Sequence, residues 1–274
     1  MNAIHQSRLR LEMRHLPLCL ALLLPGTSAW AGAWTLSAGM TDTLLSSTIS
    51  SSEHYFDADH KIIKGERYSK KEFQLRLEHG MSDTTTVIVA PTYMRTRAGG
   101  SAGGSYNGMG YSELGLRQRV YIDDANVFSL QGVLRAAGAR DSDNAAELGN
   151  TDHEYDLRAL YGRNLQFGSW PAFANIELAW RIRSGSPPDE HRVDLTLGLK
   201  PSPQWLITLQ SFSVYSDGTG QGAFTAPYYY HKAQAGLTWR FLPAWSAGVN
   251  ALTTYAGKNA WREQGVVATL GHQF

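Results

Sequence analysis

The sequence predicts an all-β fold, a closed, antiparallel, up-and-down transmembrane β-barrel of about twelve strands. Three observations lead to this prediction. Runs of roughly 10 to 14 residues alternate apolar with polar side chains, and the connections between them alternate in length. The last run, 262–274, keeps the same alternation and stops on the aromatic Phe274. Because side chains of a strand point alternately to its two faces, such runs suit a sheet with lipid on one face and water on the other.

Residues 1–31 are predicted to be a secretory signal peptide, which makes 32–274 the barrel domain. A basic leader precedes an apolar run at 16–24, and Ala29-Trp30-Ala31 forms a small-residue cleavage site. The apolar run is too short for a spanning helix, although a short membrane anchor is the alternative. Cys19 is the single cysteine and lies inside that run, so the mature chain would hold no disulfide. Its formal charge would be near zero, which argues against a nucleic-acid partner.

The predicted strands follow one another at hairpin spacing. In the region 154–161, for example, Tyr155 and Leu157 alternate with Glu154 and Asp156. Two runs, 84–96 and 204–216, do not keep one phase, and a β-bulge could shift them. The predicted strands are 33–42, 71–80, 84–96, 109–122, 127–139, 152–165, 171–183, 190–200, 204–216, 227–241, 245–256 and 262–274.

Short connections carry the Pro, Asp, Asn, Ser and Gly residues of tight turns, and long ones carry flexible sequence such as the glycine-rich 99–104. This asymmetry predicts short periplasmic turns, longer outer loops and both termini in the periplasm. The longest predicted outer loop, 43–70, is a candidate for docking a partner. The other long connections are 97–108, 140–151, 184–189, 217–226 and 257–261.

Aromatic residues predict two belts, one at each membrane interface. Those beside the short turns or the C-terminus are Phe128, Phe167, Trp170, Trp205, Phe241, Trp245 and Phe274. Those toward the long connections are Tyr93, Tyr106, Tyr111, Tyr155, Tyr215, Tyr228, Tyr229, Tyr230, Tyr255 and Trp261.

Charged residues fall on the opposite phase from the apolar ones, so they are predicted to line the lumen. On the lipid face each would cost about 2–4 kcal/mol at the bilayer mid-plane. Either they pair with one another and fill the lumen, or an arginine-rich wall guides polar or anionic solutes. The predicted pore-lining residues are Arg76, Glu78, Glu113, Arg117, Arg119, Arg135, Glu154, Asp156, Arg158, Glu177, Arg181, Arg183, Arg192, Asp194, Lys232, Arg240 and Glu263.

The closing run carries a resemblance. Val266, Ala268 and Leu270 form an apolar face that ends near Phe274, which resembles the C-terminal strand of Gram-negative outer-membrane β-barrels. The resemblance implies insertion by the barrel-assembly machinery, an outer-membrane location, and contact with outer-membrane lipid and lipopolysaccharide. His272 departs from the pattern, which usually has an aromatic or aliphatic residue there. The segment 73–83 also resembles hairpins of barrels linked to phenol-degradation pathways.

Catalytic and metal-binding patterns are weak. Outer-membrane hydrolases of similar strand number need a Ser–His pair with an orienting group, and no His-x-Ser lies on a predicted strand. The group His54, Asp57, Asp59 and His60 and the group Asp141, Asp143, Asn144 and Glu147 are better explained as solvated loops than as metal sites. We therefore assign no catalytic, cofactor or metal residue.

The function predicted from the sequence is a channel or binding site for a small polar or anionic solute. The alternatives are an outer-membrane lipid-modifying hydrolase, and a structural or docking barrel whose lumen is plugged by paired charges.

Overall fold

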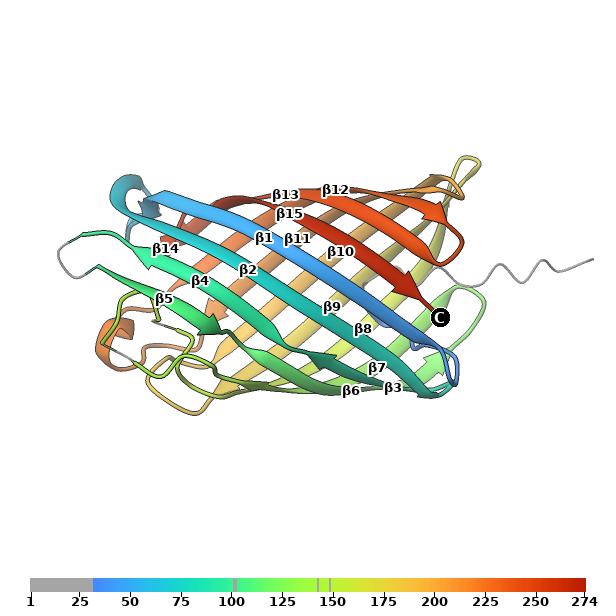
Figure 1. Ribbon diagram of the computed structural model, residues 1–274, viewed down its shortest axis with the longest axis horizontal. Coiled ribbons are helices and arrows are strands. Elements are labelled where there is room, and N and C mark those ends of the chain that lie inside the picture. The colour runs from blue at the N-terminus through green and yellow to red at the C-terminus, as the bar shows by residue number, and fades with distance from the viewer. Residues whose placement is uncertain (1–31, 101–102, 142, 148) are drawn as a thin grey trace, which may run out of the picture.

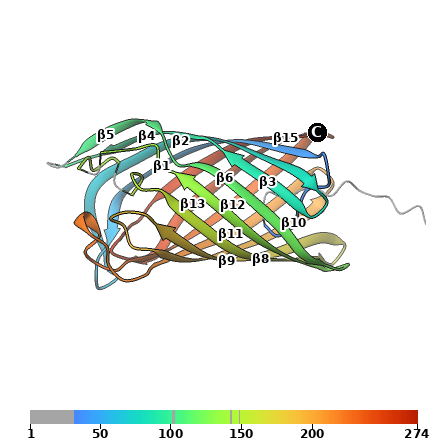
Figure 2. The ribbon, with the colours of Figure 1, turned by 90° about the horizontal axis from the view of Figure 1, so that it is seen from below.

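The computed structural model describes residues 32–100, 103–141, 143–147 and 149–274 as one antiparallel sheet that closes on itself (Figures 1 and 2). The signal peptide predicted for 1–31 lies outside the described residues. Within the described part of the chain, no helix is long and apolar enough to cross a membrane.

The described residues form fifteen strands and one short 3-10 helix. They are β1 (Thr41–Phe56), β2 (Ile62–Ser82), β3 (Thr85–Ala90), β4 (Thr92–Ala98), β5 (Gly104–Met109), β6 (Ser112–Ile122), β7 (Asn126–Ala136), β8 (Glu154–Phe167), β9 (Trp170–Arg183), β10 (Glu190–Ser202), β11 (Trp205–Ser216), η1 (Gly222–Phe224), β12 (Tyr229–Leu242), β13 (Trp245–Lys258), β14 (Ala260–Trp261) and β15 (Gln264–Gln273).

The first and last long strands close the barrel. Leu45 on β1 lies opposite Leu75 on β2 and also opposite Leu270 on β15. A strand that is paired on both sides in this way leaves no free edge at the seam, which is how barrels satisfy their backbone polar groups.

The fifteen strands make twelve crossings, as the sequence predicts. Pro91 divides one crossing into β3 and β4, which both pair with β2. Residues 110–111 divide the next crossing into β5 and β6, and β14 is a short piece ahead of β15. Proline has no N–H to give to a ladder, so it interrupts the strand. The alternation continues across Pro91, and it was hard to recognise in 84–96 because the inward Ile88 and Met94 are apolar as well. Strand β11 runs without interruption.

The prediction for the first hairpin was wrong. Residues 33–40 form no strand, and the predicted outer loop 43–70 is mostly the β1–β2 hairpin, whose connection is only 57–61. Strand β1 escaped detection because serine and threonine occupy half of its positions, with only Leu45 and Ile49 marking the outward face in the middle of the strand. The long docking loop expected at 43–70 therefore does not exist. The flexible connection predicted at 97–108 is also shorter, because β4 runs to Ala98 and β5 begins at Gly104.

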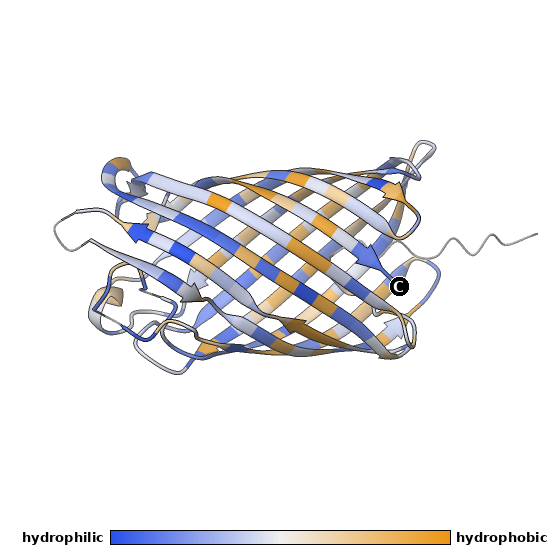
Figure 3. Ribbon diagram, in the orientation of Figure 1, coloured by the Kyte–Doolittle hydropathy of each residue, from blue (hydrophilic) through white to orange (hydrophobic). Residues whose placement is uncertain are grey.

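Apolar side chains face outward and charged side chains face inward. Leu157 and Leu197 are 53% and 54% exposed, whereas Glu154 on the opposite phase is fully buried. Figure 3 shows the resulting alternation of hydrophobic and hydrophilic segments along single strands. The phase inferred from the sequence is thus the phase of the fold.

The two ends of the barrel differ. Short turns gather at the end that holds Phe274, here called the turn end, and longer connections with η1 gather at the other, the loop end (Figure 1). At the turn end the His272 ring stacks between Trp245 and Phe274, with centroid distances of 4.2 and 5.1 Å. An aromatic environment therefore accommodates the histidine that departs from the usual C-terminal pattern.

Residues 33–38, the inner segment, lie inside the barrel near the turn end. The Ala33 N–H donates to Asn175 Oδ1 at 3.1 Å, and the Leu36 N–H donates to Thr86 Oγ1 at 3.0 Å. The Trp34 ring meets Phe173 edge-on at 5.9 Å. Ala33 and Leu36 are buried, so the chain enters the lumen before it turns into β1.

Two glycines leave room for the inner segment. A Cβ on Gly80 would lie 2.1 Å from the Ser37 carbonyl oxygen, and one on Gly162 would lie 2.5 Å from the Trp34 ring. Both contacts are shorter than packed atoms tolerate, and the first involves backbone, which yields least. The absence of a side chain at Gly80 is therefore a condition for the position of the inner segment.

Gly80→Ala is expected to destabilise the folded barrel by about 1–3 kcal/mol through overpacking against Ser37. Thermal unfolding, followed as the loss of the folded band in semi-native electrophoresis, measures the effect. Gly132→Ala is the matched control, because its new Cβ would meet only Leu157 Cδ2 at 3.8 Å. Equal unfolding temperatures for the two variants would contradict the placement of the inner segment.

Candidate functional site in the barrel interior

A single network of ion pairs covers one wall of the interior, from β2 to β10. Its members are linked through nitrogen–oxygen contacts within 4.0 Å. We call it the ion network. Its seven basic members are Arg76, Arg117, Arg135, Arg158, Arg181, Arg183 and Arg192, and its seven acidic members are Glu78, Glu113, Glu154, Asp156, Glu177, Glu190 and Asp194.

Glu154 is the most buried junction of the ion network. Its carboxylate accepts from Arg183 Nε at 2.8 Å, lies 3.5 Å from Arg181 Nε, and pairs with Arg135. The side chain is fully buried, so these three cations take the place of water around it. The strand register brings them together, since Arg135 and Arg183 lie directly opposite Glu154 on β7 and β9.

Arg158 joins three strands at a second junction. Its guanidinium donates to Asp156 at 2.6 Å, to Glu177 at 2.8 Å and to Asp194 at 2.9 Å. These acids stand on β8, β9 and β10. The planar fork of five donors lets one arginine satisfy several carboxylates, which a lysine could not do in the same way.

The ion network also reaches across a strand that carries none of its members. Arg117 on β6 pairs with Glu78 on β2 at 3.1 Å, and Arg76 on β2 lies 3.4 Å from Glu113 on β6. Between them lies β3, whose inward Ile88 is fully buried. The long charged side chains therefore form a layer above the smaller side chains of β3.

A connection at the loop end completes the ion network. Tyr228, which precedes β12, donates its hydroxyl to Glu190 at 2.8 Å and accepts from Arg183 Nη1 at 3.0 Å. Burial, and next the neighbouring Glu190 carboxylate, raises the pKa of the Tyr228 phenol, so it remains a donor at neutral pH. The β11–β12 connection is thus fixed to the wall.

The inner segment is tied to the same groups. Arg117 donates to the Trp34 carbonyl at 3.0 Å, and Asn175 donates to Glu177 at 3.0 Å while accepting from Ala33. The inner segment and the ion network therefore occupy the same side of the lumen.

Charge balance decides what this wall offers a solute. Seven arginines face seven carboxylates, so the ion network carries no net charge, although the sequence predicted an arginine-rich wall that would attract anions. An anion passing it would meet guanidinium groups already bound to acids. The wall is polar and ordered rather than anion-attracting.

The opposite wall, formed by β11, β12, β13, β15 and β1, is polar and mostly uncharged. Most of its inward side chains keep partial exposure, whereas six of the fourteen members of the ion network are buried. Gln234 donates to Gln210 at 3.0 Å, and Gln210 donates to Thr196 on β10 at 3.2 Å. We call this the uncharged wall. Its inward residues include Ser46, Thr48, Thr208, Gln210, Gln234 and Asn250.

A smaller cluster interrupts the uncharged wall toward the loop end. Lys232 pairs with Glu263, which also accepts from Ser50 Oγ at 2.5 Å. Lys70 pairs nearby with Glu72 at 3.4 Å. Lys70 and Ser50 were missed in the sequence because both fell in the supposed loop 43–70.

Most of the predicted pore-lining residues belong to the ion network. Four do not: Lys232 and Glu263 form their own pair, and Arg119 and Arg240 make no ion pair within 4.0 Å among the described residues. Glu190 was missed, although it stands two residues before Arg192 in the same phase of β10. That spacing was the signal that would have found it.

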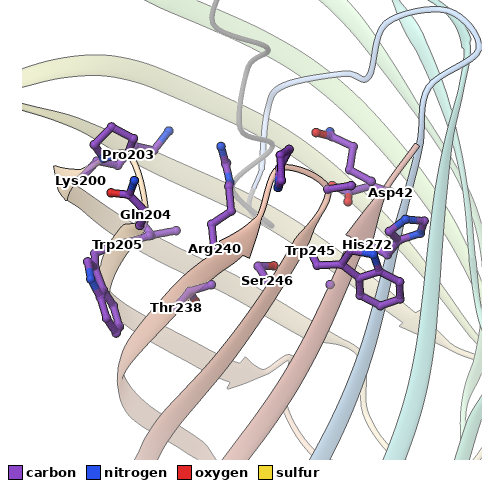
Figure 4. Close-up of a pocket in the computed structure, with 15 residues that line it drawn as sticks. Asp42, Lys200, Pro203, Gln204, Trp205, Thr238, Arg240, Trp245, Ser246 and His272 are labelled. Carbon is purple, nitrogen blue, oxygen red and sulfur yellow. The ribbon is translucent and has the colours of Figure 1, made fainter.

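A pocket of about 70 Å³ lies at the turn end beneath the β10–β11 and β12–β13 turns. Figure 4 shows Arg240 between these turns, with Lys200 to one side and Asp42 to the other. Its lining is charged, so the uncharged wall does not extend to this end of the barrel.

The structure contains a Ser–His contact that no sequence motif predicted. His231 Nδ1 lies 2.8 Å from Ser213 Oγ across β12 and β11, on the outward face among Tyr215, Tyr229 and Tyr255. The two are far apart in sequence and meet only through strand register. Among the described residues, no carboxylate or amide oxygen is seen to accept a hydrogen bond from the His231 ring, so the contact lacks the orienting group of a hydrolytic triad.

The two acidic loop groups have structural partners. Asp57 Oδ1 accepts the N–H groups of Asp59 and Lys61. Glu147 accepts those of Arg140 and Asp141. Both carboxylates thus cap turns.

Comparison with known proteins supports the fold. No protein-family model matches the chain, and no curated protein matches it in sequence. Among solved structures, an outer-membrane channel from Pseudomonas putida F1 superposes with a TM-score of 0.74 at 16% identity, over 88% of this chain and 98% of that one.

Two further structures agree less closely. The translocator domain of the autotransporter NalP from Neisseria meningitidis gives a TM-score of 0.54 at 13% identity, over 87% of this chain and 89% of that one. The NanC porin gives 0.53 at 8% identity, over 84% and 98%. At these identities the likeness establishes the fold, which is that of outer-membrane β-barrels.

Proposed function

We propose that this protein resides in the outer membrane and conducts small polar solutes without net charge along the uncharged wall. The turn end would face the periplasm and the loop end the exterior. Its outward apolar face suits lipid, and its fold is shared with an outer-membrane channel. The observation that carries the solute class is the self-neutralised ion network opposite a polar, partly exposed wall.

The second candidate is a structural barrel with a closed lumen. The specific observation in its favour is that the inner segment and the ion network together fill one side of the interior. The two candidates differ in whether the remaining space conducts.

Planar-bilayer recording of the purified protein separates them. The channel proposal expects discrete conductance steps with weak ion selectivity, together with vesicle swelling in small neutral sugars or amides. A silent bilayer and no swelling, from a preparation that migrates as folded barrel, would leave the structural barrel as the better account.

Gln234→Arg is expected to shift permeability toward anions by about threefold, because a fixed charge would then stand unpaired on the uncharged wall. The reversal potential in a salt gradient measures the shift. Gln264→Arg is the control, since this exposed side chain lies on the outward phase of β15. If both variants keep wild-type selectivity, solutes do not pass along the uncharged wall.

A further inference from the structure

Four basic side chains break the apolar pattern on the outer surface of the barrel. Lys71 and Arg67 stand on the outward phase of β2, and Arg95 and Arg97 on that of β4, and all four are exposed. We call them the basic patch. In Figure 3 the halves of β2 and β4 toward the loop end are predominantly hydrophilic, unlike the middle of β2.

The strand register concentrates these charges. Lys71 lies directly opposite Arg95, and Arg97 follows two residues later on the same face. Directly opposed residues have Cβ atoms about 5 Å apart, and like charges in that position repel. Arg67 has Glu53 at 3.7 Å, but no acid lies within 4.0 Å of Lys71, Arg95 or Arg97 among the described residues.

The neighbouring outward residues indicate where the basic patch lies along the membrane normal. Toward the turn end, the next outward pair is Phe73 opposite Tyr93, which are 51% and 45% exposed. Aromatic girdles flank the apolar band of a membrane barrel, and cationic side chains become inexpensive only near the interface. In the orientation proposed above, the basic patch therefore lies at the headgroup level of the outer leaflet.

At the height of the basic patch, the other strands carry different outward side chains. Outward positions near the loop end include Tyr155 on β8, Trp180 on β9, Tyr215 on β11 and Tyr255 on β13, all exposed. At this height the positive charge is thus confined to one sector of the barrel. If the basic side chains only anchored the barrel at the membrane interface, they would not need to gather in one sector.

From this geometry we infer that the basic patch binds the phosphate groups of the phosphorylated glycolipid of the outer leaflet, lipopolysaccharide. Arginine offers planar paired donors that match phosphate oxygens, and adjacent cations hold a multiply charged headgroup better than scattered ones. The bound phosphates would also remove the repulsion between Lys71 and Arg95. The inference rests on the membrane placement proposed above, but not on conduction.

The test compares unfolding temperatures of the full barrel in phospholipid nanodiscs with and without bisphosphorylated lipid A. Wild type is expected to gain about 3 °C or more, because a ligand that binds only the folded state stabilises it. The variant K71Q/R95Q/R97Q is expected to lose this gain. Arg163→Gln, an exposed outward position on β8 near the turn end, is the control that should keep it.

Three results would overturn the inference. They are an equal gain in the triple variant, an equal gain in wild type from lipid A without phosphates, and an equal gain from inorganic phosphate alone. If the triple variant does not fold, the three single variants replace it, each expected to lose part of the gain. Bilayer conductance should be unchanged in these variants, so a silent wild-type channel would refute the proposed conduction without touching this result.

Discussion

Replacing Glu154 with glutamine is expected to destabilise the folded barrel by about 3 kcal/mol, because it removes the buried counter-charge that three arginines share. Arg135, Arg181 and Arg183 all contact this carboxylate, which is fully buried. Each arginine retains another acid, such as Glu113 beside Arg135 at 3.0 Å, which keeps the loss toward the lower end of the range for buried pairs. Urea unfolding in detergent micelles measures it.

The control for Glu154 is Glu53→Gln. Glu53 pairs with Arg67 at 3.7 Å, and the two side chains are 54% and 71% exposed. An exposed pair contributes at most about 1 kcal/mol, so this variant should unfold close to wild type. The double variant Glu154→Gln/Arg183→Gln should recover part of the lost stability. Should Glu154→Gln prove no less stable than Glu53→Gln, the ion network would not be a determinant of stability.

Deleting residues 33–38 is expected to raise single-channel conductance by about twofold or more, because it removes the inner segment from the lumen near the turn end. The loss of Trp34 and Leu36 frees the space now held against Phe173 and Thr86. Planar-bilayer recording measures the change, and heat-modifiable migration on gels verifies that the deleted protein folds.

Thr35→Ala is the control for the deletion. Its side chain makes one hydrogen bond to the Asp83 carbonyl at 2.8 Å, and the contacts that hold Ala33, Trp34 and Leu36 remain. Conductance of this variant should equal that of wild type. A folded deletion variant with unchanged conductance would show that the inner segment does not narrow the path.

Much of the barrel could be predicted because a strand has a period of two. Leu157 and Asp156 differ in environment only because they stand on opposite phases of β8, and the sequence carries that phase directly. The same reasoning placed thirteen of the fourteen ion-network residues on one face, since charge cannot face lipid without cost. The alternation of short and long connections along the chain predicted that one end of the barrel carries short turns and the other carries longer loops.

The first hairpin shows where this reasoning stops. Strand β1 needs no apolar inward face, since its inward Ser46, Thr48 and Ser50 face a polar interior. Because neither face of β1 is strongly apolar, the sequence shows no clear alternation of apolar and polar residues there, and the hairpin was predicted to be a loop. For the inner segment the prediction was wrong in the opposite direction, because a strand was predicted where none forms. Trp34 and Leu36 alternate as in a strand, yet they pack inside the barrel.

By itself, then, the sequence determined the class of fold and, outside the first hairpin, which side chains share a face, because these follow from local periodicity. Only the tertiary structure decided which charges meet, that arginines and acids balance, that a segment occupies the lumen, and that Ser213 meets His231. Those facts depend on strand register and closure, which bring together residues that no sequence spacing links.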